Sequence, residues 1–173
     1  NLEHKVPKNS SGTTVMDFMN SQFDRTVTWK DAAWMIKQWN KPFAIKGILS
    51  VEDAKIAADI GASAVMVSNH GGRQMDGSPA PFEVIGDIVD AVGDKVEVIL
   101  DGGIRRGTHI LKALAMGAKA CMGGRAYLYG LAAGGEEGAY RSLSLLREEV
   151  QNNMILLGTT NIDQISSKHL RKV

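Results

Sequence analysis

Cysteine, net charge and long apolar runs are all scarce in this sequence. Cys121 is the only cysteine among 173 residues, so no disulfide can form within the chain, as is typical of proteins from a reducing compartment. The formal net charge is +1, which removes the simplest case for nucleic-acid binding. No run approaches the roughly 18 apolar residues of a membrane-spanning helix, and no secretory signal pattern is present. We therefore expect a cytoplasmic protein without nucleic-acid partners.

Residue clusters with metal-ligand spacing are also missing. No group of cysteine, histidine and carboxylate residues has the spacing of a metal site, so no metal ion is expected. His4, His109 and His169 have no neighbours in the sequence that suggest chemistry, and we expect them at the surface. The charged residues at 147–149 (REE) are interpreted as a solvated helix face.

The sequence does contain a recurring unit of one short apolar strand and one helix. Ser50 followed by Asp53 predicts a helix N-terminus, and Gly61 predicts where that helix ends. Glycine is frequent at 19 residues and proline rare at 4. The pattern predicts strands over 43–49, 64–69, 96–101 and 120–123. It predicts helices over 13–21, 28–40, 50–61, 81–92, 106–117, 125–133 and 136–157, with a further turn near Ile162.

Strands that alternate with helices and are apolar on both faces predict a parallel α/β fold. A doubly wound sheet usually carries one dominant glycine motif after its first strand. Here polar residues follow all four strands, which is typical of a (β/α)8 TIM barrel. A closed barrel needs eight units, so the four units predict about the last half of one. We assign residues 28–173 to this C-terminal half and residues 1–27 to a connecting loop.

The loop after the second strand combines an imidazole with a guanidinium. Its sequence over residues 68–74 is SNHGGRQ, with His70 and Arg73 separated by two glycines. Histidine is suited to proton transfer near neutral pH, and arginine is suited to binding a carboxylate with two parallel hydrogen bonds. The loop therefore predicts a site for a carboxylate substrate. The alternative is a solvated loop whose polar residues are incidental.

Glycine-rich turns with arginine follow the third and fourth strands, at 101–107 (DGGIRRG) and 123–125 (GGR). Backbone N–H groups at a helix start, with an added cation, form an anion site. Phosphate sites in TIM barrels commonly lie after strands seven and eight, which would make these strands the fifth to the eighth. Either turn alone is a weak signal, but the pair predicts phosphate binding.

Lys46 and Asp101 place charges within or at the end of apolar strands. A lysine is expensive to bury without a partner, so Lys46 predicts a fixed cation that faces an anionic ligand or an electron-rich ring. The alternative is a lysine on an edge strand that points to water. Asp101 is suited to accept hydrogen bonds from a polyol.

Three motifs together resemble the FMN-dependent α-hydroxy-acid dehydrogenase/oxidase family. They are 68–77 (SNHGGRQMDG), 100–107 (LDGGIRRG) and 123–125 (GGR). The segment 28–31 (TWKD) and Lys46–Gly47 resemble the helix and strand that precede these motifs in the family. The resemblance runs in order from about Thr28 to the C-terminus and implies oxidation of a small L-2-hydroxy acid, such as lactate or glycolate, to the 2-oxo acid.

The resemblance also implies a role for each motif residue. It implies that His70 is the active-site base, that Arg73 holds the substrate carboxylate, and that Lys46 lies beside the flavin ring. Further flavin and ribityl contacts are implied for Ser68 and Asp101. The FMN phosphate site is implied for Gly102, Gly103, Arg105, Gly124 and Arg125.

The chain departs from the family pattern because it has no counterpart of the first half of the barrel. We therefore expect a partner, the N-terminal half of the barrel from the same gene product or from a second chain, and an enzyme that is active only with it. A homo-oligomer is expected, with peripheral membrane association as an option. Two other functions stay open from sequence: a non-catalytic FMN- or phosphate-binding half-barrel, and a different phosphate-binding barrel enzyme such as an isomerase.

Overall fold

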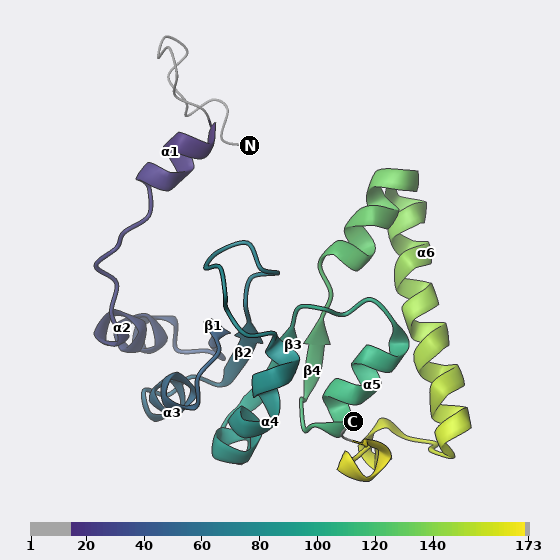
Figure 1. Cartoon of the computed structure of the whole chain (residues 1–173). Coiled ribbons are helices and arrows are strands. Elements are labelled where there is room, and N and C mark those ends of the chain that lie inside the picture. The colour runs from purple at the N-terminus through teal and green to yellow at the C-terminus, as the bar shows by residue number, and fades with distance from the viewer. Residues whose placement is uncertain (1–14, 172–173) are drawn as a thin grey trace.

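The computed structural model describes residues 15–171, and Figure 1 shows their arrangement. The helices are α1 (Val15–Ser21), α2 (Trp29–Trp39), α3 (Val51–Asp59), α4 (Pro81–Val92), α5 (Gly107–Ala115) and α6 (Arg125–Leu157). The strands are β1 (Ala44–Ile48), β2 (Ala64–Ser68), β3 (Glu97–Asp101) and β4 (Ala120–Met122). Two short 3-10 turns, η2 (Ile162–Gln164) and η3 (Ser167–His169), follow α6. Each strand and helix lies where the sequence predicts it, apart from small shifts at the ends.

The four strands form one parallel sheet in the order β1-β2-β3-β4. Consecutive strands in the sequence are therefore neighbours in space, and a helix connects each pair, as expected for right-handed β/α units. Within residues 15–171, β1 and β4 each have a single neighbour and form the edges of the sheet.

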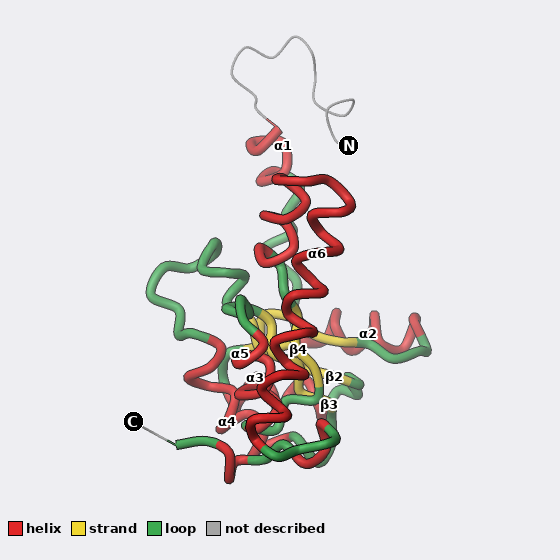
Figure 2. The backbone as a smooth tube through the Cα atoms, turned by 90° about the vertical axis from the view of Figure 1, so that its right-hand side faces the viewer, coloured by secondary structure: helices red, strands yellow, loops and turns green. Residues whose placement is uncertain are grey.

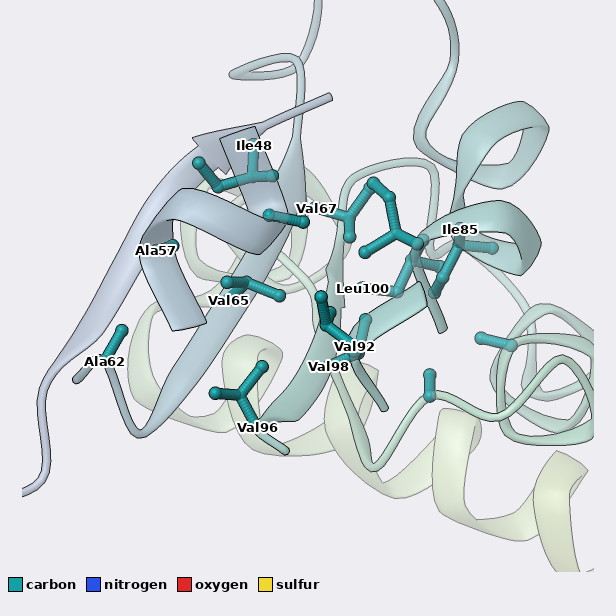
Figure 3. Close-up of a cluster of buried hydrophobic side chains, with 14 of the residues drawn as sticks. Ile48, Ala57, Ala62, Val65, Val67, Ile85, Val92, Val96, Val98 and Leu100 are labelled. Atoms are coloured by element: carbon teal, nitrogen blue, oxygen red, sulfur yellow. The ribbon is translucent and has the colours of Figure 1, made fainter. Parts of the chain in front are cut away.

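One face of the sheet carries the hydrophobic core. Side chains of β2 and β3 pack there against α3 and α4, and Val65, Val67 and Leu100 are fully buried (Figure 3). Ile85 and Val92 of α4 are equally inaccessible to solvent. Complete burial of such side chains contributes about 1.5–3 kcal/mol each, so this layer fixes the position of the strands and of the loops at their ends.

The opposite face of the sheet has a different composition. The strand register aligns Lys46, Met66, Ile99 and Ala120 in one row across the four strands. None of these four residues belongs to the core beneath the helices in the described part of the chain. Met122, on the edge strand β4, is 45% exposed. This face corresponds to the inner, side-chain-filled face of a barrel.

The last helix consists of two segments rather than one. Gly134 and Gly135 have non-helical backbone angles, and φ of Gly135 is +58°. The segments fold back on each other (Figures 1 and 2), with the backbones of Gly130 and Gly138 in contact. The break confirms the predicted division between helices over 125–133 and 136–157. Among residues 15–171 no helix is both long and apolar enough to cross a membrane.

The segment before the sheet contains α1 and α2. The carboxylate of Asp31 accepts hydrogen bonds from the N–H and the hydroxyl of Thr28, each at 2.7 Å, and so caps the start of α2. The predicted short helix over 13–21 is present as α1 from Val15 onward. Residues 1–14 lie outside the described part of the chain. The predicted domain boundary between residues 27 and 28 stays a prediction.

Candidate active site at the carboxyl ends of the strands

Polar side chains from three neighbouring strands meet at the carboxyl end of the sheet. The Nζ of Lys46 on β1 lies 2.8 Å from Oδ2 of Asp101 on β3 and 3.2 Å from Oγ of Ser68 on β2. The Ser68 hydroxyl donates to the same Oδ2 of Asp101 at 2.6 Å. The parallel register explains the meeting, because it pairs Ser68 directly with Asp101. The three residues form one hydrogen-bonded cluster.

The cluster holds Asp101 in its ionised form. Partial burial, the largest single influence on this carboxyl, favours the neutral acid. Hydrogen bonds from Lys46 and Ser68 and the positive charge of Lys46 together outweigh burial, so the pKa of Asp101 is lowered from its usual value. The Lys46 side chain is 39% exposed. Lys46 therefore lies on an edge strand, as one alternative from the sequence had it, and is also ion-paired with Asp101. The ion pair fixes the partly exposed ammonium group of Lys46 at the carboxyl end of the sheet.

His70 stands directly above this cluster in an unusual backbone conformation. Its φ is +57°, a left-handed geometry that costs free energy for a residue other than glycine. The Ser68 hydroxyl oxygen accepts the backbone N–H of His70 at 3.1 Å. A Cβ added at Gly47 would lie only 2.8 Å from Nε2 of His70. The absence of a side chain at Gly47 therefore lets the imidazole lie against β1.

Asn69 organises the loop that carries His70. Its Oδ1 accepts the backbone N–H groups of Gly71 and Gly72 at 3.1 and 3.2 Å, and its side-chain amide donates to the carbonyl oxygen of Pro79 across the loop. Arg73 lies beyond these contacts on the exposed part of the loop. In the part of the chain that the structure describes, its guanidinium makes no hydrogen bond or ion pair, and it is not brought into contact with His70.

The two glycine-rich turns border open space at the same end of the sheet. A Cβ added at Gly103 or at Gly124 would meet no atom within 4 Å. Gly102 and Gly103 have φ values of +121° and +72°, a conformation that favours glycine. The side chain of Arg105 is exposed beside them. Open glycine backbone next to a guanidinium suits a phosphate group.

Arg125 follows the second turn but also contacts the histidine loop. Its Nη2 donates to the carbonyl oxygen of Gly71 at 2.8 Å, and a Cβ at Gly71 would lie 2.7 Å from the same nitrogen. A guanidinium has five N–H donors, so this bond leaves others for a ligand. Arg125 therefore links the glycine turn after β4 to the loop after β2, a connection that the sequence did not predict.

Two residues that the sequence assigned to the surface also support the first glycine turn. His109 is half-buried, and its Nδ1 lies 3.0 Å from the carbonyl oxygen of Gly103 and 3.2 Å from the N–H of Arg105. Glu149 of α6 accepts the N–H of Gly107 at 2.6 Å and pairs with Arg106 at 2.8 Å. Both residues stay partly exposed at the surface, but each also satisfies backbone groups of the turn and the start of α5, a role that the sequence did not predict. His169 is half-buried too, whereas His4 lies outside the described residues.

The Glu149 carboxylate is held ionised by the groups that it binds. The N–H of Gly107 and the Arg106 guanidinium lower its pKa from the usual value, against a smaller effect of burial. Cys121 on β4 behaves in the opposite way, because burial raises the pKa of its thiol to about 11. A thiol in this state is a poor nucleophile. Among the described residues no group of three or more His, Cys, Asp or Glu could hold a metal ion.

The residues at this end of the sheet suit flavin mononucleotide as a ligand. Lys46 provides a cation, the Ser68–Asp101 pair provides hydrogen-bonding groups, and the open turns with Arg105 provide a place for a phosphate. Sequence reasoning missed Asn69 and Gly47. The Asn-His-Gly-Gly order did carry a signal for Asn69, since asparagine commonly accepts backbone N–H groups in turns.

Comparison with known proteins identifies the family. The model of the FMN-dependent dehydrogenase family matches residues 2–172, which extends nearer to the N-terminus than the sequence motifs do. An L-lactate dehydrogenase from Caulobacter sp. (strain K31) is 43% identical over 99% of this chain and 46% of its own length. A pre-mycofactocin synthase from Mycolicibacterium smegmatis is 51% identical over 80% of this chain and 35% of its own length. The chain thus spans less than half the length of these relatives.

Solved structures agree with the sequence comparison. The monotopic membrane protein (S)-mandelate dehydrogenase superimposes with a TM-score of 0.87 and 39% identity, over 91% of this chain and 42% of that protein. A flavocytochrome b2 variant with bound sulfite gives a TM-score of 0.81 and 40% identity, over 88% of this chain and 42% of that one. The predicted α/β class and partial TIM barrel are confirmed, and so is FMN as the cofactor of the family. The chain belongs to the FMN-dependent dehydrogenase family.

Proposed function

We propose that this chain forms the proton-transfer and phosphate-binding half of an enzyme that oxidises a small L-2-hydroxy acid to the 2-oxo acid with FMN. The cluster of Lys46, Ser68, His70 and Asp101 at the strand ends carries this proposal. A module that only bound a phosphate would not need a strained histidine held beside an ion pair. Strain of this kind gathers at sites where it serves chemistry.

The oxidation converts a CH–OH group to a carbonyl, which removes two electrons and two protons. FMN, when bound, accepts the two electrons and one of the two protons. His70 takes one proton from the substrate through its imidazole, a task suited to histidine near neutral pH. The left-handed backbone and the contact with Gly47 keep the ring at one position, so little reorganisation is needed at the moment of transfer.

The other residues of the site bind and orient. Arg73 holds the substrate carboxylate. Lys46, fixed by Asp101, supplies positive charge to the electron-rich ring of the cofactor. Ser68 and Asp101 contact the flavin and its ribityl chain. The ionised Asp101 acts there as an acceptor, because the Ser68 hydroxyl already donates its proton to that carboxylate. The phosphate is held by the two glycine turns and their arginines, at Gly102, Gly103, Arg105, Gly124 and Arg125.

The chain works together with the N-terminal half of a barrel. The edges at β1 and β4 each present a row of backbone groups with no neighbouring strand within residues 15–171, and an unpaired buried group costs about 1–3 kcal/mol. The native particle is therefore expected to contain a second polypeptide segment that completes the ring. A flavin-loaded monomer of 18.6 kDa with no other polypeptide present would contradict this part of the proposal.

The activity is tested by flavin reduction under nitrogen. The purified native particle is expected to be yellow, and its released chromophore is expected to be FMN. L-lactate, glycolate and L-mandelate are then added separately, and at least one should bleach the flavin absorbance. An FMN-loaded particle that none of these acids bleaches would contradict the proposed oxidation while leaving FMN binding intact.

A second candidate function is that of a pre-mycofactocin synthase, the activity for which one of the relatives is named. The observation in its favour is 51% identity over 138 residues, against 43% for the L-lactate dehydrogenase. The same bleaching experiment separates the candidates, because the 2-hydroxy-acid proposal requires reduction by a simple hydroxy acid.

Exchange of Arg73 for lysine is expected to weaken substrate binding by about tenfold. Lysine keeps the positive charge but loses the pair of parallel hydrogen bonds to a carboxylate. Substrate affinity is measured from the spectral change of the bound flavin during titration. An effect below about twofold, or an equal effect in the exposed control Arg171→Lys, would count against a carboxylate clamp.

The Arg105→Ala variant is expected to bind FMN about tenfold more weakly while its affinity for riboflavin stays unchanged. The two ligands share the ring and the ribityl chain, so the difference isolates the phosphate. Both affinities are measured by quenching of flavin fluorescence. Arg125 is less suitable for this test, because its removal also frees the carbonyl oxygen of Gly71. Equal losses for the two ligands would refute a phosphate contact by Arg105.

A further inference from the structure

The Nδ1 atom of His109 lies between two backbone groups of the first glycine turn. A single ring nitrogen, Nδ1, lies within hydrogen-bond distance of both an acceptor, the carbonyl oxygen of Gly103, and a donor, the N–H of Arg105. The ring is held from the side by Phe82 of α4, whose centroid is 6.5 Å away in an edge-on arrangement. The imidazole is therefore fixed in place and cannot satisfy both backbone groups at once.

The proton on Nδ1 decides which backbone group is bound. When Nδ1 carries no proton, it accepts the N–H of Arg105. When Nδ1 is protonated, as it is in one neutral tautomer and always in the cation, it donates to the carbonyl oxygen of Gly103, and the N–H of Arg105 loses its acceptor. The cation therefore fixes this second arrangement, whereas the neutral ring can adopt either one. Protonation thus adds a positive charge beneath the turn and releases one backbone donor, and both changes favour an anion.

The charged groups around His109 come from two elements. Arg105 and Arg106 belong to the turn itself and oppose a further positive charge. Glu149 reaches the turn from α6, is ionised, and interacts electrostatically with His109. Phe82, the contact from α4, carries no charge. A bound dianion would balance the charge of the two arginines. Together with Glu149 it would leave one net negative charge around His109, which favours the protonated ring.

We propose that His109 is a positioning residue that couples proton uptake to anion binding at the turn formed by residues 102–107. The turn binds a phosphate-class dianion more tightly when His109 is protonated, and the bound dianion in return stabilises the protonated ring, as linkage requires. The identification of that anion with the phosphate of FMN rests on the proposed function.

The test uses sulfate with the native particle after its flavin has been released. Sulfate is a dianion across the whole range in which histidine titrates, so any pH dependence comes from the protein. Sulfate affinity is measured by the shifts of backbone amide NMR signals at 102–107 at about pH 8 and pH 5.5. It should be about threefold or more tighter at the lower pH. The ring signals of His109 should titrate at higher pH when sulfate is present.

Two variants assign the effect. His109→Asn places an amide group where Nδ1 lay. The asparagine side chain can still form a hydrogen bond with the turn but cannot take up a proton, so the variant should bind sulfate with little pH dependence. His169→Asn is the matched control, because Nδ1 of His169 lies in the same way between the N–H and carbonyl oxygen of Ser166, at 3.1 and 3.2 Å. That variant should keep the full dependence.

The outcomes separate this inference from the proposed function. Sulfate binding at the turn that is independent of pH, or a pH dependence that persists in His109→Asn, would overturn the role of His109 and leave the phosphate site standing. No shift of the turn signals with sulfate in the unmodified chain would overturn both. FMN and riboflavin distinguish the cofactor phosphate from a free anion. Because the phosphate of FMN itself titrates at about pH 6, the comparison is between the unmodified chain and His109→Asn: the substitution should change the pH dependence of FMN affinity and leave that of riboflavin unchanged.

Discussion

Flavin reduction by substrate is expected to slow by about a hundredfold or more when His70 is replaced by glutamine. The glutamine amide keeps much of the size and polarity of the imidazole but cannot take a proton. FMN affinity should change little, because the residues proposed to hold the ring and the phosphate lie on β1, β2, β3 and the two glycine turns, and the His70 side chain is not among them. The rate is measured by mixing the FMN-loaded particle with substrate under nitrogen in a stopped-flow instrument.

The backbone at His70 requires a second variant. At a φ of +57°, asparagine has a lower conformational free energy than glutamine. His70→Asn therefore removes the base with less strain on the loop. Both variants should lose reduction to a similar extent and keep FMN. His169→Gln, which changes a histidine at the far end of the molecule, serves as the control and should reduce normally. An unchanged rate in both His70 variants would remove the proton-transfer role from this residue.

The Gly107→Ala substitution is expected to lower the free energy of unfolding by about 3 kcal/mol. An added Cβ would lie 2.6 Å from Cβ of Glu149 and 2.6 Å from the backbone N of Val150. These are atoms of a neighbouring helix, so α5 and α6 must separate. That movement also stretches the 2.6 Å hydrogen bond from the Gly107 N–H to Glu149. Thermal unfolding followed by circular dichroism should show a midpoint about 10 °C lower.

Gly86→Ala provides the matched control for this substitution. Gly86 also lies in a helix, but an added Cβ there would meet only the flexible end of Met116 at 3.6 Å. Alanine in a helix is preferred over glycine by about 0.5–1 kcal/mol, so this variant should unfold at the same temperature or a higher one. A Gly107→Ala protein as stable as Gly86→Ala would show that α5 and α6 do not pack as closely as described.

The order of strands and helices was readable from the sequence because it depends on local signals. Ser50 with Asp53 marks the start of one helix and Gly61 marks its end, and the break at Gly134–Gly135 follows from two adjacent helix-breaking residues. The meeting of Lys46, Ser68 and Asp101 was also foreseeable in outline, since the carboxyl ends of adjacent parallel strands lie at one edge of the sheet.

The contacts between distant loops and helices were not readable in this way. Nothing local to Glu149 indicates that its carboxylate binds a backbone N–H at Gly107, because that contact depends on how α6 folds back beside α5. The same holds for Arg125 and the carbonyl oxygen of Gly71. His109 looked like a surface residue because its partners are backbone groups, which a sequence pattern does not reveal.

The strand order has a consequence for folding kinetics. Every pairing in the described sheet joins strands that follow each other in the chain, as Ala64 pairs with Ala44 on one side and Glu97 on the other. Each pairing therefore closes a loop of only one β/α unit, and the entropic cost of closure does not grow as units are added. Contacts of this kind form fast, whereas the seam that closes a full barrel joins chain ends far apart in sequence. We therefore expect the described sheet to grow unit by unit, without a step in which strands distant in the sequence must first meet.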